Sequence, residues 1–87
     1  MSRIAFFPGS FDPFTAGHKN ILIRALTMFD EVVVGVGVNI GKKGHYTTEQ
    51  KVEIARASVA DLKNVKVIAY DSLTIDCCRS MGIKHIV

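Results

Sequence analysis

Apolar runs and amphipathic stretches alternate along this chain of 87 residues. Apolar runs at residues 3–7, 31–38, 65–69 and 83–87 predict four strands. The run at 31–38 is rich in valine and lacks polar alternation, which is typical of a strand that is buried on both faces. The dipeptide Pro8-Gly9 predicts the end of the first strand.

Helical periodicity fills the segments between these strands. In the first segment the apolar residues lie at i, i+1, i+4, i+5 and i+8, and they are Ile21, Leu22, Ala25, Leu26 and Phe29. A capping box, Thr47 with Gln50, predicts the start of a second helix. The apolar residues of that helix are Val52, Ala55, Val59 and Leu62. A third helix is expected from residue 72 to about residue 81, with Gly82 at its C-terminal end.

The resulting order, β-α-β-α-β-α-β, predicts the fold class. Alternating units of this kind form a parallel sheet covered by helices, so we expect one Rossmann-like α/β domain over residues 1–87. Because the pattern stops in a strand, whose backbone groups need a neighbour, we expect the C-terminal portion of the domain to be missing from this chain.

Composition narrows the class of protein. The chain is 48% hydrophobic and 22% charged, which excludes intrinsic disorder. No apolar run reaches the length of about 18–20 residues that a membrane-spanning helix needs. The net charge is +3, and Lys42-Lys43 is the only notable basic pair, so we expect neither a membrane nor a nucleic-acid partner. Two adjacent cysteines, Cys77 and Cys78, form no disulfide framework, and we expect a cytoplasmic protein.

Two segments after strands hold the candidate chemistry, because ligands of open α/β sheets bind at the carboxyl ends of the strands. Residues 39–45 follow the second strand and match neither the P-loop nor the G-x-G-x-x-G pattern. Gly35 and Gly37 lie inside that strand, where we expect them to allow close packing.

Residues 7–18 follow the first strand and open the first helix at Gly17 and His18. Gly9 allows the backbone to approach a ligand, Ser10 offers a hydroxyl, and the helix N-terminus favours a phosphate. Two simpler interpretations stay open: His18 caps the helix, and Gly9 and Pro13 form a turn.

The same segment carries a resemblance to a known family. Thr15-Ala16-Gly17-His18 resembles the T/H-x-G-H signature of the nucleotidylyltransferase superfamily. The preceding run, Pro8-Gly9-Ser10-Phe11-Asp12-Pro13, resembles the P-G-S/T-F-D-P run of bacterial phosphopantetheine adenylyltransferases. The similarity continues through Phe29-Asp30, Lys42-Lys43 and Thr47-Thr48-Glu49-Gln50-Lys51 and so covers essentially the whole chain.

The resemblance implies a function. The family transfers AMP from ATP to 4′-phosphopantetheine, giving dephospho-coenzyme A and pyrophosphate, in the biosynthesis of coenzyme A. It uses Mg²⁺ with ATP, and it commonly assembles as a homo-oligomer, a hexamer. No protein ligand to a metal is implied.

It also implies roles for individual residues. His18 and Lys42 are then catalytic, stabilising charge on the phosphates. ATP contacts Ser10, Phe11, Gly17 and His18, and the phosphopantetheine substrate contacts Ser10, Lys42 and Thr74.

One departure and two alternatives remain. Family members are longer and carry an R-G-x-R segment and an I-S-S-S/T segment after the fourth strand, so we expect the 87-residue chain alone to be inactive or weak. Another nucleotidylyltransferase is one alternative, although such enzymes usually carry His at the position of Thr15. A half-domain that binds a nucleotide without turnover is the other.

Overall fold

The computed structural model describes residues 3–11, 13–37, 47–70, 82–83 and 85–87. Its elements are β1 (Ile4–Gly9), α1 (Ala16–Leu26), β2 (Glu31–Gly37), α2 (Thr48–Ser58), β3 (Val65–Tyr70) and β4 (His85–Ile86). The strands form one parallel sheet in the order β3-β2-β1-β4. The predicted Rossmann-like α/β arrangement is therefore confirmed for these elements. Neither described helix is long and apolar enough to cross a membrane.

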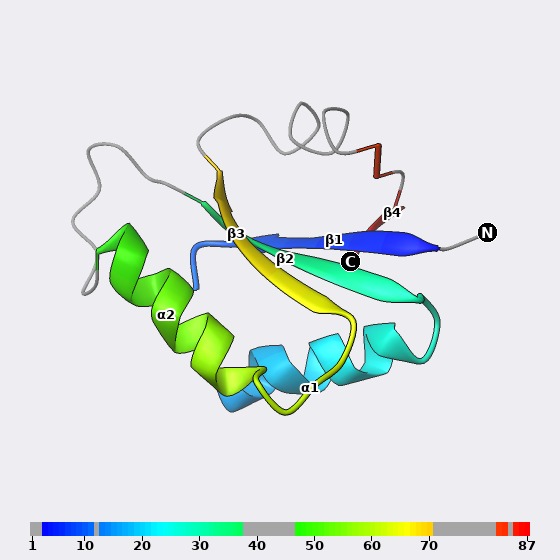
Figure 1. Cartoon of the computed structure of the whole chain (residues 1–87), viewed down its shortest axis with the longest axis horizontal. Coiled ribbons are helices and arrows are strands. Elements are labelled where there is room, and N and C mark those ends of the chain that lie inside the picture. The colour runs from blue at the N-terminus through cyan, green and yellow to red at the C-terminus, as the bar shows by residue number, and fades with distance from the viewer. Residues whose placement is uncertain (1–2, 12, 38–46, 71–81, 84) are drawn as a thin grey trace.

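Both helices lie on the same face of the sheet (Figure 1). The larger core fills the space between them and the strands, where alternate residues of β1 and β2, such as Phe7 and Val34, meet Leu22 of α1 and Ala55 of α2. The predicted helical faces are confirmed except at Ile21, which is 46% exposed. Ile21 lies at the border of this helical face, about 100° around the helix from Leu22, and is left at the surface.

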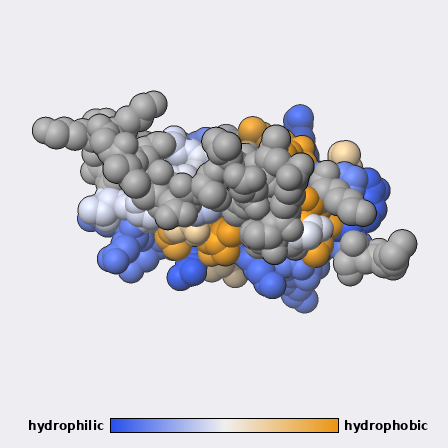
Figure 2. Space-filling view, turned by 90° about the horizontal axis from the view of Figure 1, so that it is seen from above, coloured by the Kyte–Doolittle hydropathy of each residue, from blue (hydrophilic) through white to orange (hydrophobic). Residues whose placement is uncertain are grey.

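A smaller apolar cluster lies on the opposite face of the sheet. Phe6, Val33 and Ile83 are buried there, with Ile4, Ile68 and Tyr70 packed against them. Figure 2 looks at the molecule from the side away from the helices and shows hydrophobic surface near its centre, with hydrophilic surface along its lower border. Apolar residues on both faces explain why β2 reads as a continuous valine-rich run.

The first strand is longer than predicted, and the prediction that Pro8-Gly9 ends it is wrong. Pro8 pairs with Gly35 and Gly9 pairs with Val36, so β1 continues through both residues. In the described residues β4 pairs only with the earlier part of β1, so the proline lies where the strand has one partner, as proline requires.

The remaining boundaries differ little from the predictions. Helix α1 begins one residue earlier than expected, at Ala16, and β3 extends to Tyr70. The capping box of Thr47 and Gln50 is confirmed at the start of α2. Gly82 adopts φ +71°, the conformation expected of a glycine after a helix. The predicted third helix, at 72–81, lies outside the described residues.

Candidate functional site

A pocket opens where β1 ends and the chain turns into α1. Its volume is about 510 Å³, within the range of small-ligand sites. The lining residues all come from one stretch of chain, and they are Phe7, Pro8, Gly9, Ser10, Phe11, Pro13, Thr15 and His18. The pocket therefore lies at the carboxyl end of a central parallel strand, the place where ligands of this fold class bind.

Phe11 forms a buried part of the wall of this pocket. The residue is 3% exposed, and its φ is +44°, a left-handed conformation that costs about 1–2 kcal/mol for a residue other than glycine. Its ring lies so close to Gly9 that a Cβ at Gly9 would come within 2.9 Å of the Phe11 Cζ. A side chain at Gly9 would therefore force the buried Phe11 ring to move, and the interpretation that Gly9 forms a turn is wrong, because Gly9 lies in β1 and pairs with Val36.

Phe11 also belongs to an aromatic cluster around His18. The imidazole meets the Phe11 ring edge-on at 4.9 Å between centroids and the Phe14 ring at 5.4 Å. Phe7 packs edge-on against Phe11 at 5.2 Å. These contacts hold the imidazole ring at the wall of the pocket.

His18 caps α1, as the simpler interpretation of this residue predicts. It stands three residues after the N-cap Thr15, and its Nδ1 accepts the Thr15 backbone N–H at 2.9 Å. The Thr15 Oγ1 in turn accepts the His18 backbone N–H at 3.4 Å. Only one ring nitrogen is used, and Nε2 makes no hydrogen bond to any residue that the structure describes. Capping and ligand binding are therefore compatible in this side chain.

The first turn of α1 presents an electropositive surface beside His18. It contains no acidic residue, whereas the first turn of α2 carries Glu49. Gly17 is exposed, and a Cβ there would meet only the Thr15 Oγ1, at 3.6 Å. The N-terminal N–H groups of a helix carry a partial positive charge, and an anion bound here would face no competing carboxylate of that turn.

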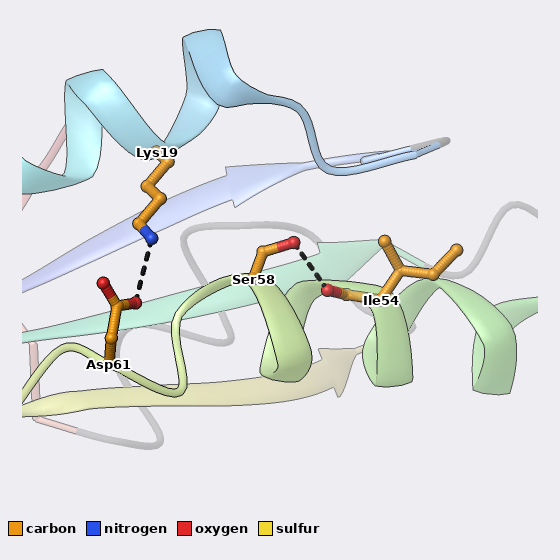
Figure 3. A network of polar contacts seen from close by, with 4 residues as sticks. All are labelled: Lys19, Ile54, Ser58 and Asp61. Carbon is orange, nitrogen blue, oxygen red and sulfur yellow. Dashed lines mark hydrogen bonds and ion pairs between the residues drawn. The ribbon is translucent and has the colours of Figure 1, made fainter.

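An ion pair connects α1 with the turn that follows α2. The Lys19 ammonium lies 2.9 Å from Asp61, in the turn that follows α2 (Figure 3). The hydrogen bond from Lys19, together with one from the backbone, lowers the pKa of the Asp61 carboxyl below its ordinary 3.8. Within α2, the Ser58 hydroxyl donates to the Ile54 carbonyl at 2.8 Å.

The predicted site residues are placed as follows. Ser10, Phe11 and His18 line one pocket, and Gly17 lies in the helical turn beside it. Lys42 and Thr74 lie outside the described residues. Among the described residues no group of three His, Cys, Asp or Glu side chains gathers into a metal site.

From the sequence, Thr15 is identified only as part of the family signature and Phe14 is not singled out, although both residues contact His18. The signal for Thr15 was present, since T-x-x-H has the spacing of a capping box with histidine in the place of Glu or Gln. The sequence also assigns no role to Tyr70. This residue ends β3, and its ring packs edge-on against Phe6 at 5.5 Å between centroids.

The chain is similar to curated phosphopantetheine adenylyltransferases. The phosphopantetheine adenylyltransferase of Phocaeicola vulgatus is 52% identical over 85 residues, which are 98% of this chain and 56% of that protein. The phosphopantetheine adenylyltransferase of Clostridium kluyveri is 53% identical over 87 residues, which are 100% of this chain and 52% of that protein. The chain therefore spans about half the length of the curated relatives it matches.

A solved structure supports the fold. The crystal structure of NadR protein in complex with NAD and AMP-PNP superposes with a TM-score of 0.76 at 17% identity, over 98% of this chain and 29% of that one. The family model described as cytidylyltransferase-like matches residues 6–87, which include the whole pocket segment. This chain belongs to the cytidylyltransferase-like family.

Proposed function

We propose that this chain provides the nucleotide-binding part of an enzyme that transfers AMP from ATP to 4′-phosphopantetheine, giving dephospho-coenzyme A and pyrophosphate. The observation that carries the proposal is His18, held at the pocket wall with one nitrogen bonded to Thr15 and the other open to a ligand. Relatives about half identical to the chain bear the name of this enzyme.

The reaction needs positioning and charge stabilisation more than proton transfer. The attacking group is a phosphate oxygen, which is anionic near neutral pH and needs no general base. It bonds to the α-phosphorus of ATP, the bond from that phosphorus to the bridging oxygen breaks, and pyrophosphate leaves. Charge develops on the phosphate oxygens, and one well-placed donor contributes about 3–4 kcal/mol to such a transition state.

His18 is suited to be that donor. The edge of its imidazole that Thr15 does not occupy carries Nε2, which can donate to a phosphate oxygen. Ser10 lines the same pocket and adds a hydroxyl, and Gly17 leaves the helix N-terminus open. Phe11 acts as a buried support for these groups.

The proposal extends to groups that the described residues do not include. Lys42 meets the phosphate of phosphopantetheine and supplies a second catalytic donor, and Thr74 contacts the pantetheine arm. Mg²⁺ enters with ATP and neutralises phosphate charge, with no ligand from the protein. The whole enzyme works in the cytoplasm as a homo-oligomer, a hexamer, and it binds the product dephospho-coenzyme A and coenzyme A.

A second candidate is nucleotide binding without turnover by this chain alone. The observation that favours it is length, since the chain spans about half of its relatives. The alternative that the chain belongs to another nucleotidylyltransferase, with a different nucleotide substrate, is tested by comparing Mg-ATP with Mg-CTP.

Amide-detected NMR titration of the 87-residue chain tests binding. Mg-ATP is expected to shift the amides of Gly9, Ser10, Gly17 and His18, and Mg-CTP is expected to shift them less. Unshifted amides in this segment with Mg-ATP would contradict the proposal. A pyrophosphate-release assay with 4′-phosphopantetheine then separates turnover from binding alone.

His18→Gln is the variant that separates the two roles of the histidine. Glutamine satisfies a capping box, as Gln50 does at the start of α2, so the variant is expected to keep the stability of the fold. It lacks the imidazole donor, so affinity for Mg-ATP should fall about tenfold or more. Equal affinity in the variant and the parent would remove His18 from the site.

A further inference from the structure

The polar contacts of the His18 imidazole with described residues all involve one atom, Nδ1. The Thr15 backbone N–H donates to it at 2.9 Å, and the Thr15 Oγ1 lies 3.0 Å from it. The same Oγ1 accepts the His18 backbone N–H at 3.4 Å. Thr15 therefore meets this ring nitrogen with two groups, its backbone amide and its hydroxyl.

This arrangement selects a tautomer. A neutral imidazole carries one proton, on Nδ1 or on Nε2, and the other nitrogen accepts. The backbone N–H of Thr15 can donate to Nδ1 only if Nδ1 keeps its lone pair. When the proton lies on Nε2, the single lone pair of Nδ1 accepts the Thr15 backbone N–H, and the Thr15 hydroxyl oxygen accepts the His18 amide. The backbone donors at this helix start are then satisfied together.

The other tautomer is disfavoured by the same geometry. With the proton on Nδ1, that N–H could donate to the Thr15 Oγ1 at 3.0 Å, but the Thr15 backbone N–H, 2.9 Å away, would lose its acceptor and face another donor. A half-turn of the ring about its Cβ–Cγ bond would relieve this conflict. Packing against Phe11 at 4.9 Å and Phe14 at 5.4 Å opposes that rotation.

We propose that Thr15 is a positioning residue that holds His18 as the Nε2–H tautomer and aims this donor into the pocket. The inference rests on the proposed function, in which Nε2 meets the phosphates of ATP. Thr15 acts through His18 rather than on the substrate. The general reason is that the hydrogen bond at one imidazole nitrogen decides whether the other nitrogen carries a proton and can act as a donor.

The two helices of this chain provide a matched pair of variants. Thr15→Val removes the hydroxyl from the capping box of α1 and keeps the shape of the side chain. Thr47→Val does the same in the capping box of α2, whose third residue is Gln50 and which has no imidazole. Thr15→Ser restores the hydroxyl and serves as the conservative variant.

The direct test is the ¹⁵N spectrum of the histidine rings of the 87-residue chain, in mildly alkaline buffer where imidazoles are neutral. The signals of His18 are assigned by their loss in His18→Gln. We expect the parent chain and Thr15→Ser to show the proton on Nε2 of His18. We expect Thr15→Val, which keeps the backbone N–H, and Thr47→Val to show the parent tautomer, so that any loss of affinity in Thr15→Val reports on the support of the ring by the hydroxyl.

A second measurement is the affinity for Mg-ATP from the same samples. Thr15→Val is expected to bind about three- to tenfold more weakly, since one hydrogen bond of ordinary strength is lost from the support of His18. Thr15→Ser and Thr47→Val are expected to bind as the parent chain does.

Three outcomes would overturn the inference. The first is a proton on Nδ1 of His18 in the parent chain, a result that needs no variant to fold. The second is Thr15→Val with the parent affinity for Mg-ATP, which would mean that the Thr15 side chain does not position His18. The third is an equal loss of affinity in Thr47→Val, which would mean general destabilisation. If the parent chain shows the Nε2–H tautomer and does not bind Mg-ATP, the proposed function fails and the tautomer assignment stands.

Discussion

Gly17→Ala separates what the fold requires from what a ligand requires. Gly17 is the second residue of α1, and its φ lies outside the left-handed region that would demand glycine. An added Cβ would meet only the Thr15 Oγ1, at an ordinary van der Waals distance of 3.6 Å. Among the described residues, therefore, nothing excludes a side chain from this position.

The expected effect on stability is favourable. Alanine is preferred over glycine in a helix by up to about 1 kcal/mol, and the backbone here already has a conformation that alanine adopts. A gain of that size raises the melting temperature by roughly 4–8 °C in a chain of this length. Thermal unfolding followed by circular dichroism measures it, and Ala16→Gly at the adjacent exposed position should lower stability.

The expected effect on the ligand is the opposite. If phosphates approach the N–H groups of the first turn, the new methyl group stands between them and the backbone of Gly17. Affinity for Mg-ATP should fall about tenfold or more, which corresponds to about 1.4 kcal/mol. The NMR titration described above measures it on the same sample. A more stable Gly17→Ala chain that binds as the parent does would refute the placement of the phosphates, and a destabilised one would refute the steric argument.

Three further variants test the fold around the site. Gly9→Ala places a Cβ 2.9 Å from the Phe11 Cζ, so urea unfolding should show a loss of about 1–3 kcal/mol and the Mg-ATP titration a weaker affinity; an unchanged chain would mean that the ring moves aside freely. Gly35→Ala places a Cβ against the fully buried ring of Phe6, closer than the Gly9 Cβ would come to Phe11, so it should lose more stability than Gly9→Ala, and the reverse order would contradict the packing described. Asp61→Asn tests the ion pair with Lys19: the lowered pKa of Asp61 stabilises the fold at pH values above 3.8, and this contribution disappears as the pH falls through the folded-state pKa. The stability difference between parent and Asp61→Asn should therefore shrink in acid, and a constant difference would exclude Asp61 as its source.

Local patterns by themselves determined the elements and their order. The four apolar runs, the helical spacing of the first two helices and the Thr47-Gln50 box are properties of neighbouring residues, and each of them corresponds to a described element near its predicted place. The third helix stays a prediction, since it lies outside the described residues. The parallel topology followed, because helices that alternate with strands leave few other arrangements. The position of the pocket after β1 followed as well, since it depends only on strand direction.

Tertiary structure decided the details that make the pocket work. The strand continues through Pro8, where the described residues pair with it on one side, and Phe11 takes a left-handed conformation in which its ring fills the space beside Gly9. The direction in which His18 presents its Nε2 depends on rings and backbone groups brought together by folding. Periodicity reports which face of an element is buried, but the register, the ring packing and the orientation of a donor arise only when separate segments compete for the same space.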